Sequence, residues 1–80
     1  MPKTPFKSWT RSVVRCWAGY RADERPISFL STDNEKAIRR ILKSWREPDH
    51  LYFQVETADG RAYELRHHEH KDVWEVRDLT

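Results

Sequence analysis

The sequence predicts a mostly β protein, a small antiparallel meander or partly open barrel of about five strands. Two observations lead to this prediction. Apolar and polar residues alternate along 51–57 and again along 62–66, as they do in strands that bury one face. The segment 58–60, Ala-Asp-Gly, separates these two runs, and an Asp-Gly turn between alternating runs indicates a β-hairpin.

The register of this hairpin follows from keeping its apolar side chains on one face. A three-residue loop over 58–60 pairs Phe53 with Leu65 and Val55 with Tyr63, whereas a two-residue loop would place charged residues opposite Phe53 and Val55. The longer loop also puts Gly60 at the left-handed position that closes a type I turn with a bulge. We therefore expect a residue with a Cβ to be disruptive at position 60.

A third strand is expected around Trp74 and Val76, which can face Leu65 and Tyr63 across a loop through 68–71. That loop is polar and contains no glycine or proline, so we expect it to be longer and looser than the first. The predicted buried face of the three-stranded meander consists of Phe53, Val55, Tyr63, Leu65, Trp74 and Val76.

The residues before the meander give weaker signals. Residues 1–10 contain two prolines and little periodicity, so we expect a flexible basic arm followed by a single small β domain over 11–80. Residues 11–20 alternate as a strand does, with Val13 and Cys16 on opposite sides. Residues 27–30 are apolar and follow a proline, which the first position of a strand tolerates.

Residues 34–46 allow two interpretations. Thr32 and Glu35 have the spacing of a helix capping box. Four apolar residues then follow at i, i+3, i+4 and i+7, namely Ile38, Ile41, Leu42 and Trp45. This spacing predicts a helix near 34–46 packed on a three-stranded sheet. The alternative is a hairpin that turns at Asp33 and Asn34 and continues as a bulged strand over 35–46.

A set of ordered motifs spans roughly residues 20–78. It consists of Glu24-Arg25-Pro26 with Phe29, Trp45-Arg46-Glu47, Tyr52-Phe53 with Val55, Asp59-Gly60-Arg61, Tyr63 with Leu65-Arg66-His67, and Trp74. This pattern resembles a small family of bacterial proteins that share a domain of unknown function. The resemblance implies a second hairpin before the Trp-Arg-Glu motif, which favours strand over helix for 35–46. It also implies a link to nucleic acid, because some relatives are encoded near lesion-bypass polymerases, and it supplies no catalytic residues.

Length and composition limit the classes of function. A chain of 80 residues forms at most one domain with a modest core, and a homodimer that shares this core is a reasonable hypothesis. Cys16 is the only cysteine, so no intrachain disulfide can form, which fits a reducing compartment. No apolar run has the length of a membrane span. We expect a cytoplasmic protein without membrane contact.

The N-terminal region is the first candidate site. Residues 1–21 contain five basic residues and no acidic one, and cations interleaved with rings can neutralise phosphates and stack bases. The predicted nucleic-acid-binding residues are Lys3, Lys7, Trp9, Arg11, Arg15, Trp17, Tyr20 and Arg21. The simpler interpretation is a solubilising arm whose tryptophans cover an open edge of the sheet.

Two weaker candidates concern ions. Arg25 and Arg46 can bind an anion through paired guanidiniums, or form ordinary ion pairs with Glu24, Glu47 or other carboxylates, which we favour. His67, His68 and His70, with His50, are the weak candidates for metal ligands. No CxxC or HExxH spacing supports a metal site, so we predict no metal and no cofactor.

Catalysis has the least support. Cys16 beside Arg15 has the context of an activated thiol, but a lone cysteine in an apolar run is more often a small buried hydrophobe. No acid–base pair or phosphate-binding loop accompanies it, so we predict a binding protein and not an enzyme. Two classes of function remain: a nucleic-acid-binding or accessory module, and a protein-interaction or oligomerisation module with no nucleic-acid role.

Overall fold

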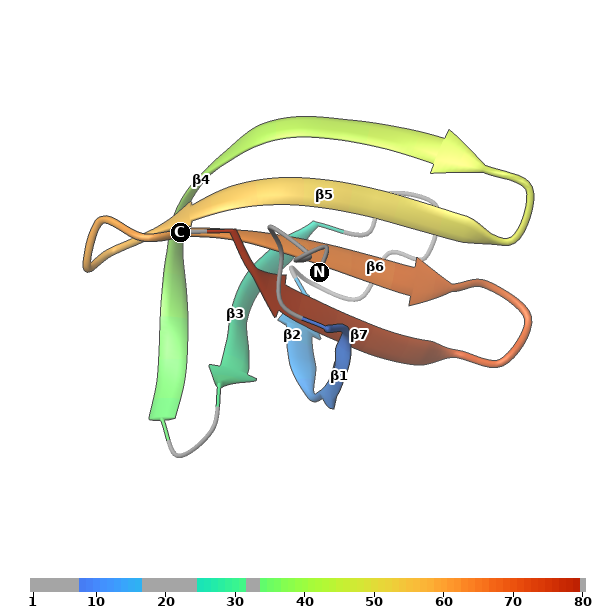
Figure 1. Ribbon diagram of the computed structural model, residues 1–80, viewed down its shortest axis with the longest axis horizontal. Helices are drawn as coiled ribbons and strands as arrows, with labels where there is room; N and C mark the ends of the chain where they lie inside the picture. Colours follow the sequence, from blue (N-terminus) through green and yellow to red (C-terminus); the bar gives the residue numbers. More distant parts are fainter. Residues whose placement is uncertain (1–7, 17–24, 32–33, 80) are drawn as a thin grey trace, which may run out of the picture.

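The computed structural model describes residues 8–16, 25–31 and 34–79 of the chain. These residues form a single antiparallel sheet in the order β1-β7-β6-β5-β4-β3-β2 (Figure 1). Within them, no helix has the length and apolar character needed to cross a membrane. The strands are β1 (Thr10–Ser12), β2 (Val14–Cys16), β3 (Pro26–Ser31), β4 (Asn34–Glu47), β5 (His50–Thr57), β6 (Ala62–His68) and β7 (Val73–Asp78).

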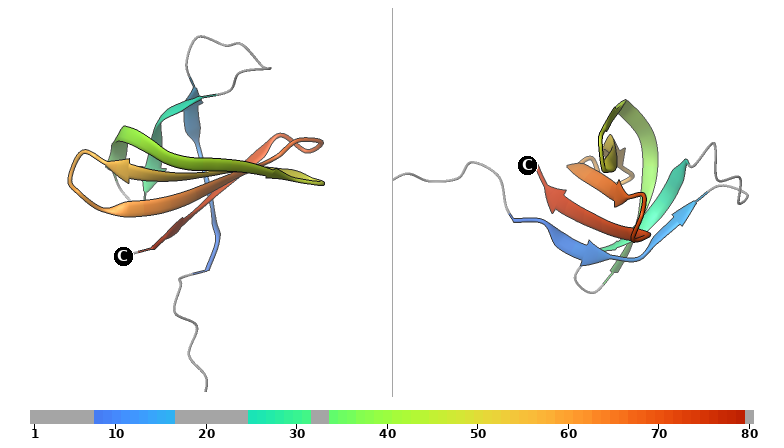
Figure 2. Two further views of the ribbon diagram at one scale, coloured as in Figure 1. Left: turned by 90° about the horizontal axis from the view of Figure 1, so that it is seen from above. Right: turned by 90° about the vertical axis from the view of Figure 1, so that its right-hand side faces the viewer.

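The sheet curls into a nearly closed barrel because β1 and β2, which are adjacent in the chain, lie at opposite edges of the sheet. β1 pairs with β7, and β2, one residue further along, pairs with β3. At the corner between them, the amide of Leu30 donates a hydrogen bond to the carbonyl of Val13 at 3.0 Å. Figure 2 shows the resulting curvature end-on. The predicted partly open barrel is confirmed. The described residues form seven strands where about five were predicted, and the stretch expected as one N-terminal strand supplies two of the seven.

The predicted helix near 34–46 is wrong: this segment is the long strand β4. Its pairing with β5 shifts between Ile38 and Arg40 and again between Ile41 and Lys43. Each bulge inserts one extra residue, so the inward positions recur every three residues, at 38, 41 and 44, and the spacing resembles that of a helix. The alternative of a bulged second strand is confirmed. Asn34, which was expected in the turn, already pairs with Ser31, and Asp33 lies outside the described residues. Bulges also bend a strand, and β4 follows a long arc in Figure 1.

The meander of β5, β6 and β7 has the predicted first hairpin. Phe53 pairs with Leu65 and Val55 with Tyr63, the loop occupies 58–60, and Gly60 has a φ of 85°. The amide of Gly60 donates to the carbonyl of Thr57 at 2.9 Å, which closes the turn.

The expected register of the third strand is wrong by two residues. Trp74 pairs with His67, and Val76 pairs with Leu65. β6 continues through His68, whose carbonyl accepts a hydrogen bond from the amide of Asp72 at 2.8 Å, so the turn comes later than expected. Because the shift is even, the inward face of β7 is unchanged.

The core lies inside the barrel and contains few aliphatic residues. Phe29 of β3 packs edge-on against Tyr63 with ring centroids 5.1 Å apart. Trp74 is half-buried and packs against the core cluster. The buried hydrophobic residues are Phe29, Phe53, Val55, Tyr63, Leu65 and Val76, which includes five of the six residues predicted for the buried face.

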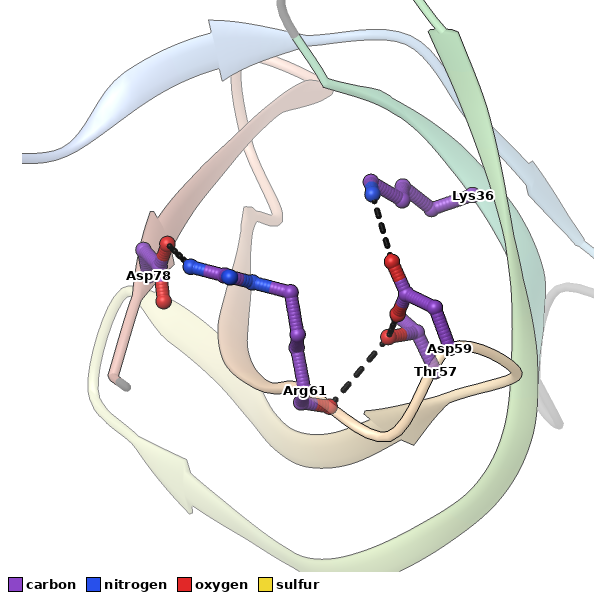
Figure 3. A network of polar contacts seen from close by, with 5 residues as sticks. All are labelled: Lys36, Thr57, Asp59, Arg61 and Asp78. Atoms are coloured by element: carbon purple, nitrogen blue, oxygen red, sulfur yellow. Dashed lines mark hydrogen bonds and ion pairs between the residues drawn. The ribbon is translucent and has the colours of Figure 1, made fainter.

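Polar contacts tie strands together at one end of the barrel (Figure 3). The ammonium of Lys36 in β4 lies 2.7 Å from the carboxylate of Asp59 in the β5–β6 loop, and the hydroxyl of Thr57 donates to the same carboxylate. The hydrogen bonds from Lys36 and Thr57 lower the pKa of Asp59 to about 2. Arg61 lies 2.8 Å from Asp78 of β7. This network connects β4, the end of β5, the β5–β6 loop and β7.

Candidate nucleic-acid interface

The outer face of the barrel carries a row of side chains that crosses five adjacent strands in register. Arg11 of β1 pairs with Glu75 of β7, Glu75 with Arg66 of β6, Arg66 with Tyr52 of β5, and Tyr52 with Trp45 of β4. Neighbouring strands lie about 4.8 Å apart, so the row is about 19 Å long. Residues on either side of this row in β5 and β6 point into the core, because strand side chains alternate between faces.

Trp45 and Tyr52 form a stacked pair at one end of this row. Their ring planes are 4° apart and their centroids are 5.0 Å apart. Both side chains are half-buried. The ammonium of Lys43 lies 5.3 Å from the centroid of the Trp45 ring. Two half-buried rings and an exposed lysine therefore lie together on the surface of β4 and β5.

Trp9 lies over the middle of the same face. Its ring meets that of Tyr52 edge-on at 6.3 Å, and the guanidinium carbons of Arg66 and Arg77 lie 4.2 and 4.4 Å from its centroid. Cation–π contacts contribute about 0.5–2 kcal/mol each, so they hold the Trp9 side chain against the sheet. Trp9, Trp45 and Tyr52 are called the ring platform below.

Most cations on the outer face are already neutralised by a cross-strand partner. Lys43 and Arg11 are different, since neither forms an ion pair with any residue that the structure describes. Among the described residues, three cross-strand ion pairs lie on this face, namely Arg40–Glu56 at 2.8 Å, Arg66–Glu75 at 2.7 Å and Arg77–Glu64 at 2.7 Å. The platform thus offers aromatic surface with two uncompensated cations and not a strongly basic patch.

The structure brings together only part of the predicted N-terminal cluster. Trp9 belongs to the ring platform, and Arg11 lies at the β1 end of the row of side chains that crosses the outer face. Arg15 lies on β2, a different wall of the barrel, where its Nε is 3.6 Å from Glu35. The remaining predicted members lie outside the described residues: Lys3, Lys7, Trp17, Tyr20 and Arg21.

The histidines are divided between the two faces of the sheet. His50 and His68 pair across β5 and β6 on the outer face, with ring centroids 4.8 Å apart, and His70 lies 6.1 Å from His68. His67 is buried on the inner face, where its Nε2 lies 2.8 Å from Asp72. The weak metal candidates His67, His68 and His70 are therefore not one cluster. No group of three or more metal-ligating residues occurs in the described ranges.

The two candidate anion-binding arginines are also apart. Arg46 forms an ion pair with Glu69, which joins the end of β4 to the β6–β7 loop. Arg25 is exposed at the start of β3 and lines a groove between β3 and β4. Its expected partner Glu24 lies outside the described residues. Cys16 is half-buried in β2, opposite Pro26.

Sequence reasoning did not find the stacked pair of Trp45 and Tyr52. The missed signal is the turn between β4 and β5, in which Glu47 pairs with His50 around Pro48 and Asp49. Counting outward from this turn places Trp45 opposite Tyr52 on one face.

Comparisons with known proteins add nothing to this geometry: no family model, curated protein or solved structure matches the chain. The resemblance to the bacterial family stays a prediction, and the function is argued from the arrangement of the side chains.

Proposed function

We propose that this protein is a binding module for single-stranded nucleic acid, which it contacts through the ring platform. The observation that carries the proposal is the stacked pair of Trp45 and Tyr52 on the outer face, with the ammonium of Lys43 beside it. Single-strand binders combine aromatic side chains that stack on bases with cations that follow the phosphates.

The arrangement of Lys43 and Trp45 suits such a contact. The ammonium lies over the indole ring at 5.3 Å and is carried by a flexible exposed side chain. A base that stacks on Trp45 takes the place of the ammonium, which then becomes free to pair with a phosphate. The cation–π contact that is lost is replaced by base stacking, which contributes about 1–3 kcal/mol per base.

Charge supports the proposal less strongly than aromatic surface does. Each ion pair on the outer face cancels one cation, so phosphate contacts fall mainly to Lys43 and Arg11. We therefore expect affinity that depends on stacking more than on salt, with little preference for sequence because every base has a π-face.

The test is fluorescence anisotropy of a labelled oligothymidylate at low ionic strength. Trp45→Leu is expected to weaken binding by about fivefold to 150-fold, the equivalent of one stacked base. Trp45→Phe keeps an aromatic ring and serves as the matched control, so it should retain most of the affinity. Equal affinity of the parent and a folded Trp45→Leu variant would contradict the proposal.

The protein-interaction module remains the competing proposal, and it predicts a different response. Binding to a protein partner would be lost on changing an apolar residue at a sheet edge and would survive loss of Trp45. A pull-down from extract with and without nuclease separates the two cases, because only nucleic-acid-mediated capture is sensitive to nuclease.

A further inference from the structure

A second surface lies along the edge of β4 that faces away from β5. β3 pairs with β4 only over 34–37. Beyond that point, among the residues that the structure describes, β4 has β5 on one side and no strand on the other. Residues 39–47 therefore present an open edge about 30 Å long, which forms the outer rim of the long arc in Figure 1.

A groove lies where β3 and β4 diverge along this edge. Its volume is about 550 Å³, and its apolar lining includes Ile27 of β3 and Ile38 and Ile41 of β4. Ile27 is 40% exposed, and Leu42 on the adjacent bulge is 47% exposed. An open edge with unpaired backbone groups beside an apolar groove has the two components of a site for β-strand addition.

The charges around the groove indicate which strand it accepts. Arg25 and Arg39 line the groove, and neither forms an ion pair with a described residue. Arg40 also lines it, with 66% of its side chain exposed despite its pairing with Glu56. Guanidiniums at this density favour carboxylates on the incoming strand.

The same charges act against a second copy of this chain as the occupant. Pairing of two β4 edges would bring like charges together across the new interface, and like charges directly opposite each other destabilise a sheet. The basic residues on this part of β4 are Arg39, Arg40, Lys43 and Arg46. Charged edges and bulges are features by which sheets avoid pairing with copies of themselves, and β4 has both.

We propose that the open edge of β4 and its groove bind an extended acidic segment of a partner protein by β-strand addition. Acidic side chains on one face of the added strand pair with Arg25 and Arg39, and apolar side chains on the other face enter the groove. The added strand would use the free backbone edge of β4 and the groove, whereas the ring platform uses outer-face side chains that include Trp45 of the same strand. The proposal does not depend on nucleic-acid binding.

The test uses the full chain and a labelled peptide of alternating glutamate and valine, about nine residues long to match the free edge. Hydrogen exchange measured by NMR should show slower exchange of backbone amides within 39–47 when the peptide binds. The same peptide with a central proline, which cannot complete the ladder, should bind at least about tenfold more weakly.

Arg39→Glu and Arg11→Glu form a matched pair of variants, because both arginines are exposed and both changes alter net charge equally. Arg39→Glu should weaken peptide binding by about tenfold or more, and Arg11→Glu should change it less than about twofold. Equal effects of the two variants would overturn the proposal.

Three other results would also overturn it: no slowing of exchange within 39–47 at saturating peptide, equal slowing by a polyglutamate, and slowing that appears on self-association without peptide. The first result would mean that the peptide does not bind at this edge. The second would mean that binding depends only on charge, and the third that a second copy of the chain occupies the edge.

Discussion

The Lys36 ammonium and the Asp59 carboxylate lie 2.7 Å apart, which joins β4 to the loop between β5 and β6. Asp59 also accepts a hydrogen bond from the hydroxyl of Thr57. The hydrogen bonds from Lys36 and Thr57 lower the pKa of its carboxyl from 3.8 to about 2. The same contact raises the pKa of Lys36 above 10.5. Lys36 and Asp59 are therefore both charged over most of the accessible pH range.

Asp59→Asn should reduce stability in a pH-dependent way. The pKa of Asp59 is lower in the folded protein than in the unfolded chain, so its contribution is present above about pH 4 and is lost as the pH falls towards about 2. Thermal melts of parent and variant should differ at neutral pH and converge at about pH 2. A difference in Tm that stays constant across this range would contradict the role given to the ion pair.

Gly60→Val should lower the free energy of unfolding because the φ of 85° at this position is unfavourable for a residue with a branched Cβ. A Cβ at position 60 has no heavy atom within 4 Å, so the cost comes from the backbone alone and is about 1–2 kcal/mol. Gly60→Asn is the control, since asparagine tolerates the left-handed region better. Chemical denaturation of both variants checks this, and equal losses would show that the backbone conformation is not the cause.

Leu65→Ala and Leu42→Ala test where the core lies. Leu65 is fully buried and Leu42 is 47% exposed on a bulge. The first change should cost about 2–5 kcal/mol, through lost burial and a cavity, and the second about 0.5 kcal/mol or less. Urea denaturation measures both, and a large loss for Leu42→Ala would mean that the inward face of β4 has been assigned to the wrong residues.

Lys43→Gln should make oligonucleotide binding less sensitive to salt. Each phosphate contact on a single strand contributes about 0.7 to the slope of log affinity against log salt concentration, so the slope should become shallower by about that amount. Arg15→Gln is the control, because Arg15 lies on β2 and is away from the ring platform. An unchanged slope for Lys43→Gln would remove this residue from the phosphate contacts.

The sequence predicted the β class and the first hairpin because these depend on neighbouring residues. The alternation of Phe53 and Val55 with polar residues, together with Gly60, was sufficient to determine pairing and loop length. The closure of the barrel was not predictable in this way, because it depends on distant pairing. The residues on either side of Val13 pair with β7 and β3, which come later in the chain.

The helical spacing at 34–46, which left helix and strand as competing interpretations, has a specific physical cause. Arg39 and Leu42 are the extra residues of two bulges, and they convert the period of two expected for a strand into a period of three. Ile38, Ile41 and the outward Trp45 then match the spacing of a helix. A bulge is stabilised by the partner strand and the curvature of the sheet, so no local pattern identifies it.

The candidate interface was found only in part for a similar reason. Trp9 and Arg11 were selected because they belong to a basic stretch. Trp45 and Tyr52 were not selected, since their proximity depends on the pairing of β4 with β5. Aromatic residues were expected in the core, and the outer face of the sheet holds a second set.

The most direct test of the ring platform follows the indole N–H signals of the tryptophans by NMR while oligothymidylate is added. Trp9 and Trp45 lie on the outer face, whereas Trp74 packs against the core. The proposal predicts saturable shifts for the indole signals of Trp9 and Trp45, with that of Trp74 nearly constant. Unchanged Trp9 and Trp45 signals at saturating oligonucleotide would contradict it.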